Sequence, residues 1–204
     1  MKNNKTARRT SGFKSATLSQ RLGQSLTIGR VILGGSLIAA LVIIGILGLN
    51  ALINRPINIE GVERVAVLGG HTENPVNYPR VPPTGGLHFT NWQNCGIYTL
   101  PIQNEYAVHS LEHGAVWITY QPELSVEEFM ILRAVAEQGS ARLLSPVPNL
   151  PAPIVVTSWG FQLQLEQASD PRLAQFARQY ERNPQYAPEP NGYCVNGVSR
   201  MIPG

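Results

Sequence analysis

All four histidines of the 204-residue chain fall in one stretch, at positions 71, 88, 109 and 113, on segments rich in glycine and proline. Imidazole is a common ligand of zinc and copper ions, and three imidazoles with one further position make a typical site. We therefore predict that His88, His109 and His113 bind one Zn²⁺ or Cu²⁺ ion. His71 or Glu112 is expected as the fourth ligand or as a group that orients a ligand. The alternative is that these are ordinary histidines that form hydrogen bonds at turns.

His109–His113 also reads H-x-x-E-H, a string found in zinc proteases. That motif requires a helix, on which both imidazoles share a face and the glutamate serves as base. Here β-forming residues precede and follow the string, so we expect at most one helical turn. A single turn or a loop could still direct both rings to one ion. Metal- or cysteine-dependent hydrolase activity is kept only as a remote alternative.

Several other chemistries lack their signatures. The sequence has no phosphate-binding loop, dinucleotide fingerprint, G-x-S-x-G string or zinc-ribbon cysteine pattern. It has three methionines, one of them at position 1, which argues against a methionine-rich Cu(I) carrier. We predict no catalytic residues and no organic cofactor.

The elements that position the histidines are read from hydrophobic periodicity and turn residues. Residues 71–94 predict a long ordered loop, because they are dense in Pro, Gly and Asn. Helices are predicted after Ser125, which begins an S-x-x-E capping box, and after Asp170, which is followed by proline. Strands are predicted at residues 65–68, 97–100, 115–120, 141–144, 154–158 and 161–165. The order predicts a small α+β fold, with a mixed or antiparallel sheet and two helices on one face.

A transmembrane helix is predicted before this domain. No charged residue lies between Arg30 and Arg55, and Val31–Leu49 contains one polar side chain, Ser36. Nineteen residues in a helix span about 28 Å, close to the bilayer core of about 30 Å. A cleaved signal peptide would have a shorter apolar core and a small-residue cleavage site, and the sequence after the span offers none. We predict a transmembrane anchor over residues 28–54.

The charge distribution gives the orientation of this anchor. Residues 1–30 carry seven of the 16 basic residues and no acid, which leaves nine arginines against 13 acids, or −4, for the rest. The positive-inside bias places a basic tail, residues 1–27, in the cytoplasm and residues 55–204 outside. Because the main domain is acidic and lacks lysine, nucleic acid is not expected as a partner.

Cys95 and Cys194 are the only two cysteines. Outside the cytoplasm a disulfide between them is favoured, and it would tether the carboxyl-terminal segment. Two alternatives stay open, since Cys95 could be a thiolate ligand or a nucleophile beside His88.

The chain resembles a bacterial family of membrane-anchored extracytoplasmic proteins with a domain of unknown function. The resemblance rests on P-P-T-x-G-x-H at 82–88, a following Trp92, G-x-Y at 96–98, H-S-L-E-H-G at 109–114 and W-G at 159–160. Gly85 stands where a serine is expected. The resemblance covers about residues 60–190 and implies a membrane-tethered extracytoplasmic α+β domain, without implying a reaction.

Together these observations predict a single-pass protein of the bacterial plasma membrane, held in the lipid bilayer by residues 28–54. Its outer domain is expected to bind a transition metal through the histidine cluster. The alternative is a cell-envelope interaction module that presents its His-Pro-Gly loop to a protein or glycan partner without metal.

Overall fold

The structure, a computed structural model, describes residues 40–50 and 56–202, and the chain divides into two units between Arg55 and Pro56. In the first unit, residues 40–50 are helical and their large apolar side chains are exposed. Within the described residues, no helix has the length and apolar character needed to cross a membrane. The predicted tail, and residues 28–39 and 51–54 of the predicted anchor, lie outside the described residues. The anchor therefore stays a prediction.

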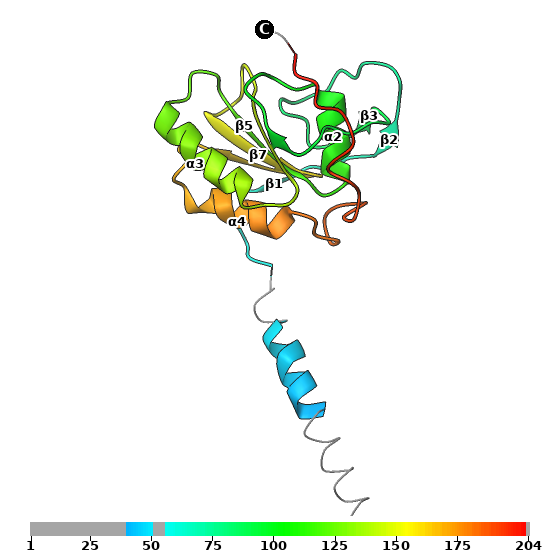
Figure 1. The fold of residues 1–204 in the computed structure, drawn as a ribbon, viewed down its shortest axis with the longest axis vertical. Helices are drawn as coiled ribbons and strands as arrows, with labels where there is room; N and C mark the ends of the chain where they lie inside the picture. The colour runs from blue at the N-terminus through cyan, green and yellow to red at the C-terminus, as the bar shows by residue number, and fades with distance from the viewer. Residues whose placement is uncertain (1–39, 51–55, 203–204) are drawn as a thin grey trace, which may run out of the picture. The chain divides into compact units, whose positions relative to one another are not determined.

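The second unit is built on a mixed six-stranded sheet (Figure 1). Its strands are β1 (Glu63–Arg64), β4 (Gly96–Ile97), β5 (Val116–Tyr120), β6 (Arg142–Pro146), β7 (Ile154–Ser158) and β8 (Phe161–Leu165). Their spatial order is β1-β8-β7-β5-β6-β4, with β4 and β5 parallel to β6 and the other pairs antiparallel. The predicted α+β class with a mixed sheet is confirmed.

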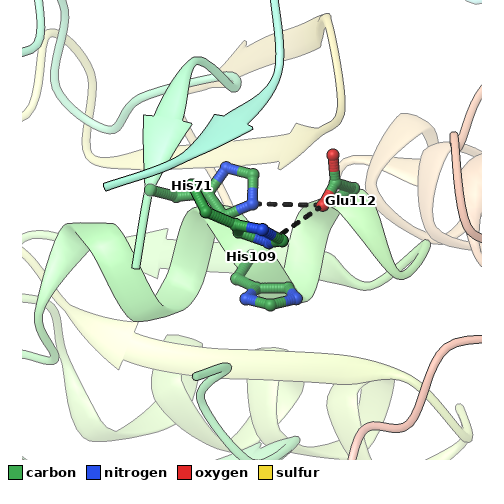
Figure 2. Close-up of side chains that lie close together, drawn as sticks. His71, His109 and Glu112 are labelled. Atoms are coloured by element: carbon green, nitrogen blue, oxygen red, sulfur yellow. Dashed lines mark hydrogen bonds and ion pairs between the residues drawn. The ribbon is translucent and has the colours of Figure 1, made fainter. Parts of the chain in front are cut away.

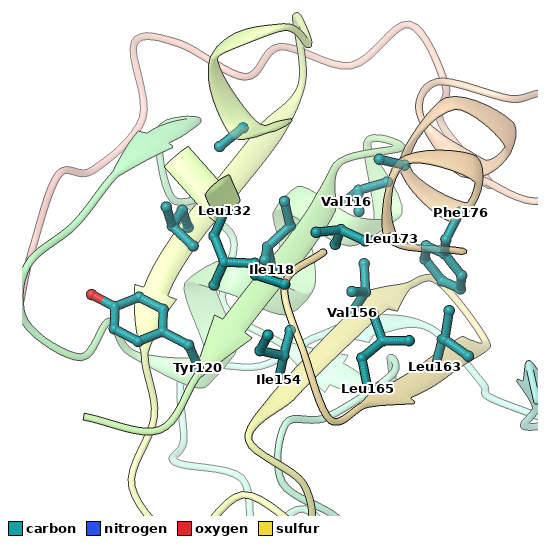
Figure 3. Packing of buried hydrophobic residues seen from close by; sticks show 14 of the residues in the cluster. Val116, Ile118, Tyr120, Leu132, Ile154, Val156, Leu163, Leu165, Leu173 and Phe176 are labelled. Carbon is teal, nitrogen blue, oxygen red and sulfur yellow. The ribbon is translucent and has the colours of Figure 1, made fainter. Parts of the chain in front are cut away.

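The two predicted helices form and pack on one face of this sheet. Helix α3 (Val126–Glu137) begins after Ser125, whose hydroxyl accepts a hydrogen bond from the Glu128 amide. Helix α4 (Pro171–Tyr180) begins after Asp170, which accepts from the Arg172 amide. Figure 3 shows the core between the helices and the sheet, where α3 contributes Leu132 and α4 contributes Leu173 and Phe176.

The opposite face of the sheet is covered by a third helix, which was not predicted from the sequence. Successive residues of a strand point to opposite faces, so Val116 and Ile118 pack under α3 and α4 while Trp117 packs on the other side. There Trp117 meets helix α2 (Asn104–Glu112). The expectation of two helices on one face is therefore incomplete, because the domain has helices on both faces.

Helix α2 corrects the expectation of at most one helical turn around His109. The β-forming residues of this segment are poor helix formers, and Gln103 at its N-cap makes no side-chain hydrogen bond. The segment is helical because Ala107, Val108 and Leu111, at helical spacing, are fully buried against the sheet. Tertiary packing thus outweighs local propensity.

Two strand predictions are also corrected. No strand forms at 65–68: β1 ends at Arg64 and pairs with β8, and the chain then leaves the sheet after one hydrogen bond from Val65 to Gly160. The strand predicted over 97–100 is replaced by the two-residue β4, which shares only Ile97 with the predicted range. The long loop contains a short parallel pair that was not predicted, formed by β2 (Gly70–His71) and β3 (Leu87–His88).

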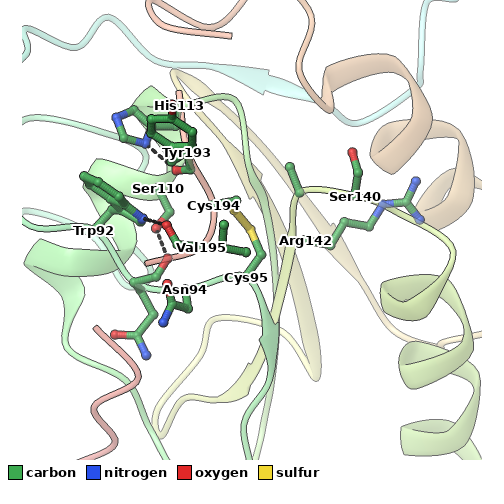
Figure 4. Close-up of a disulfide and its surroundings, with 12 residues drawn as sticks. Trp92, Asn94, Cys95, Ser110, His113, Ser140, Arg142, Tyr193, Cys194 and Val195 are labelled. Carbon is green, nitrogen blue, oxygen red and sulfur yellow. Dashed lines mark hydrogen bonds between the residues drawn. A yellow bond between two sulfur atoms is a disulfide. The ribbon is translucent and has the colours of Figure 1, made fainter. Parts of the chain in front are cut away.

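The carboxyl-terminal segment, residues 189–200, is tied to the domain near α2 (Figure 4). The predicted disulfide is present: Cys95 and Cys194, 99 positions apart, are bonded with their Cα atoms at 5.2 Å. This excludes the alternatives in which Cys95 is a free thiolate ligand or nucleophile. Trp92 and Asn94 add hydrogen bonds to the carbonyls of Val195 and Gly197.

Candidate metal centre

The parallel pair β2–β3 brings together two histidines that are 17 positions apart. In its register, His71 lies opposite His88, and their ring centroids are 4.9 Å apart. His71 is half exposed, whereas the His88 side chain is completely buried. The long loop therefore supplies one accessible and one enclosed imidazole side by side.

Helix α2 supplies the other groups from its last turn. His109 and Glu112 are three positions apart, so they lie on one side of the helix. The ring centroid of His109 lies 5.0 Å from that of His71 and 4.9 Å from that of His88. The Glu112 carboxylate oxygen Oε2 lies 3.1 Å from His88 Nε2 and 4.0 Å from His71 Nε2 (Figure 2).

These four residues form one compact group of ligand atoms. His71, His88, His109 and Glu112 each offer a nitrogen or oxygen, and these atoms all lie within 4.8 Å of one another. Of the five ligand residues predicted from the sequence, the structure therefore brings four together. His113 lies outside this group, although its Nε2 is 3.1 Å from that of His109.

Backbone carbonyls determine which ring nitrogen of His88 and of His109 is free to bind a metal ion. His88 Nδ1 lies 2.8 Å from the Gly86 carbonyl, and His109 Nδ1 lies 2.7 Å from that of Phe89. A carbonyl only accepts hydrogen bonds, so each Nδ1 carries the hydrogen. In a neutral imidazole the lone pair is then on Nε2, which faces Glu112 in His88 and His113 in His109. Metal-bound histidines are oriented by the same kind of hydrogen bond.

This assignment leaves acceptor atoms facing each other. His88 Nε2, without a hydrogen, faces the Glu112 carboxylate at 3.1 Å. Two such atoms attract only when a proton or a cation lies between them. A proton shared by the two atoms, or a metal ion bound by both, would satisfy the pair.

His109 is held in the form that binds metals. Burial, opposed by the hydrogen bond to Phe89 and reinforced by the neighbouring His113, His88 and His71, lowers its pKa to about 4. A metal ion binds the neutral imidazole, so His109 needs no deprotonation near neutral pH.

Two further residues line the group without offering a ligand. The Trp159 ring meets His88 edge-on, with centroids 5.9 Å apart. Gly69 lets the backbone pass close by: a Cβ there would lie 2.9 Å from Glu112 Oε1 and 3.2 Å from Trp159 Cζ2. No spacing in the sequence indicated the role of Gly69.

The helix also changes the interpretation of H-x-x-E-H. The sequence predicted at most one helical turn around this string. The structure has a full helix there, because His109 and Glu112 lie on α2 and His113 is its C-cap. The roles still differ from those of the protease motif, in which both histidines bind the metal and the glutamate is the base. Here Glu112 belongs to the group of ligand atoms and His113 does not.

Comparison with known families identifies the family to which the chain belongs. Residues 71–196 match the family described as "Protein of unknown function (DUF3105)". The chain belongs to the DUF3105 family. The DUF3105 match begins at His71 and contains all four histidines, Glu112 and both cysteines. No curated protein and no solved structure matches the chain.

The resemblance expected from the sequence is thus confirmed as membership of a family with a domain of unknown function. The motifs used to recognise it, and membrane anchoring, are not tested by the match. One residue of the DUF3105 domain beside the cluster was missed: Glu189, whose Oε2 lies 3.5 Å from His113 Nε2. No local pattern indicated it, because it is 76 positions from its partner in sequence.

Proposed function

We propose that this protein is a membrane-tethered extracytoplasmic protein whose DUF3105 domain binds Zn²⁺ or Cu²⁺ through His71, His88, His109 and Glu112. The observation that carries the proposal is the convergence of these ligand atoms within 4.8 Å. The Nδ1 atoms of two of these histidines are held by backbone carbonyls. Such anchoring prepares the Nε2 atoms as ligands before an ion arrives.

The ligand types favour these ions. Three imidazoles and one carboxylate suit Zn²⁺ and Cu²⁺, whereas Mg²⁺ and Ca²⁺ prefer sites made of oxygen atoms. A separation of 3.1 Å between His88 Nε2 and Glu112 Oε2 is the spacing of two atoms that bind one ion. With zinc–ligand distances of about 2.0–2.1 Å, it corresponds to an angle of about 100° at the ion.

Burial of the group supports a bound cation over free, hydrated side chains. The side chains of His88 and Glu112 are 0% and 12% exposed, so the carboxylate is largely removed from water. A buried charge is costly unless it is paired. His71, at 50% exposure, is the ligand through which the ion would enter and leave.

The cellular location of the protein is inferred from two features. The charge-free apolar segment 31–49 follows a tail with seven basic residues and no acid, which favours a bilayer anchor with the amino terminus inside. The Cys95–Cys194 disulfide supports an oxidising compartment for the domain. Together they support the bacterial plasma membrane, with the DUF3105 domain on the outer side.

Metal binding is tested on the purified full chain by calorimetric titration with Zn²⁺ and Cu²⁺. We expect stoichiometric binding that is weakened by His88→Asn and by His109→Asn. Asparagine can still donate to the carbonyl that Nδ1 contacts, but it has no atom at the position of Nε2. The exposed Glu123 gives the control, Glu123→Gln, which should bind as the wild type does. Absence of stoichiometric metal in the wild-type chain would overturn the proposal.

The orientation of the protein in the membrane is tested separately. A protease added to intact spheroplasts should remove the DUF3105 domain and leave the amino-terminal tail, detected by tags at the two ends. Cleavage of the tail with a protected domain would contradict the proposed orientation.

A further inference from the structure

A second pair of acceptor atoms lies near the pair formed by His88 Nε2 and Glu112 Oε2. His113 Nδ1 lies 2.7 Å from the Tyr193 carbonyl, so it too carries the hydrogen and leaves its lone pair on Nε2. His109 Nδ1 is held in the same way by Phe89. In the neutral rings both Nε2 atoms therefore carry lone pairs, and they face each other at 3.1 Å. This pair needs a proton or a cation between its members, as does the pair of His88 and Glu112.

A carboxylate completes this second pair. Glu189 Oε2 lies 3.5 Å from His113 Nε2, and the Glu189 side chain is 60% exposed. Its backbone amide donates to the Glu112 carbonyl at 3.0 Å, which fixes Glu189 beside the end of α2. His113 Nε2 thus lies 3.1 Å from His109 Nε2 and 3.5 Å from the Glu189 carboxylate.

The ring of His113 is held in place for this role. Besides its bond to Tyr193, it lies against Gly192, where a Cβ would overlap the ring. Trp92 also packs against the ring, with ring centroids 5.1 Å apart. The close approach of Gly192 and the tryptophan together fix the direction of Nε2.

We propose that the cluster binds two divalent transition-metal ions, the first through His71, His88 and Glu112 and the second through His109, His113 and Glu189. The inference rests on the proposed function, because the first position is the site proposed above. With one ion bound, His109 is the fourth ligand of the first position. When a second ion binds, His109 serves the second position, and each ion has two imidazoles and one carboxylate.

The geometry fits two neighbouring ions. The separation of 3.1 Å within each pair corresponds to an angle of about 100° at an ion with ligands at about 2.0–2.1 Å. The His109 ring is 4.9 Å from that of His88 and 4.5 Å from that of His113, so the two positions adjoin. One carboxylate at each position reduces the repulsion between the ions.

The test is the number of ions bound by the purified full chain. Elemental analysis after Zn²⁺ loading and removal of free metal should give two ions per wild-type chain. Glu189→Gln and His113→Asn should each reduce the number to one, and the control Glu123→Gln should leave it at two. Glu189 is exposed, so its substitution tests the second position even if His113→Asn fails to fold. In the Cu²⁺-loaded chain, electron paramagnetic resonance should show a magnetically coupled pair.

The outcomes separate the two proposals. One ion per wild-type chain, unchanged by Glu189→Gln, would overturn the second position and leave the first. No stoichiometric ion in the wild-type chain would overturn the proposed function together with this inference.

Discussion

The Nε2 atom of His88 lies 3.1 Å from the Oε2 atom of Glu112, while the Nδ1 atom of the same ring lies 2.8 Å from the Gly86 carbonyl. The carbonyl requires the hydrogen on Nδ1, so in the neutral imidazole a lone pair faces a carboxylate in a largely buried position. A neutral His88 in this position needs a cation beside its Nε2 atom, which is the need that a bound metal ion would meet. It also makes the effect of changing Glu112 predictable.

Replacement of Glu112 by glutamine should separate metal affinity from stability. A glutamine amide can donate to His88 Nε2, so it satisfies the pair without a cation. We expect the metal-free variant to unfold at the same or higher denaturant concentration than the wild type. Its affinity for Zn²⁺ should fall by more than the roughly 10–100-fold typical of groups that only orient ligands. Calorimetric titration and denaturant unfolding of the two chains measure both effects.

An unchanged Zn²⁺ affinity in Glu112→Gln would show that the carboxylate is not a ligand. Glu123→Gln removes an exposed carboxylate outside the cluster, so it should change neither affinity nor stability.

The parts of the fold that follow local rules were predictable from the sequence. The capping residues Ser125 and Asp170 start α3 and α4, and alternating apolar residues gave β8. The central strand β5 was predicted at residues 115–120, and it is buried along its whole length. The disulfide followed from an even pair of cysteines and the inferred compartment.

The parts that depend on long-range packing were not predictable. Helix α2 forms from residues of mixed propensity because Ala107, Val108 and Leu111 are buried, a stripe whose helical spacing was the available signal. The pairing of His71 with His88 depends on a two-residue parallel ribbon inside a loop. The clustering of histidines in sequence indicated the site, but only this ribbon and α2 determine which atoms meet.

The lowered pKa of His109 predicts an acid-dependent loss of stability in the metal-free protein. The folded state binds a proton at this ring only near pH 4, whereas an unfolded histidine does so near pH 6.5. Between these values the unfolded state binds more protons, so the free energy of unfolding falls as the pH falls. Each unit of pKa difference corresponds to about 1.4 kcal/mol, so the full loss is on the order of 3 kcal/mol.

Denaturant unfolding of metal-free wild type and His109→Asn, at a series of pH values from 7 to 4, measures this loss. The wild type should lose stability progressively below pH 6.5, and the variant should lose less over the same range. An equal pH dependence in the two chains would mean that His109 takes up its proton equally readily when folded and unfolded.

Removal of the disulfide should affect both stability and the second metal position. The bond closes a loop with a sequence separation of 99, and loss of a native disulfide commonly costs about 2–5 kcal/mol. Cys194 follows Tyr193, whose carbonyl orients His113, so a loosened segment frees that ring. In the double variant Cys95→Ser, Cys194→Ser we expect lower unfolding free energy and weaker binding of the second Zn²⁺ ion. The first ion, held by residues outside this segment, should bind nearly as before.

The two tryptophans beside the cluster should report the two positions separately. Trp159 contacts His88 of the first position, and Trp92 contacts His113 and His109 of the second. Cu²⁺ quenches tryptophan fluorescence at short range. In a Cu²⁺ titration of the full chain, the first equivalent should therefore quench mainly Trp159 and the second mainly Trp92. The variants Trp159→Phe and Trp92→Phe should each lose one of the two phases.

The third tryptophan supplies the internal reference for this titration. Trp117 is fully buried and donates to Ser145 on β6, so its emission should change least. If both phases disappear together in Trp159→Phe, the two equivalents bind near the same ring and the separate second position is wrong. Loss of only the later phase in Trp92→Phe would support it, because Trp92 lies against His113 and is held by Val195 of the carboxyl-terminal segment.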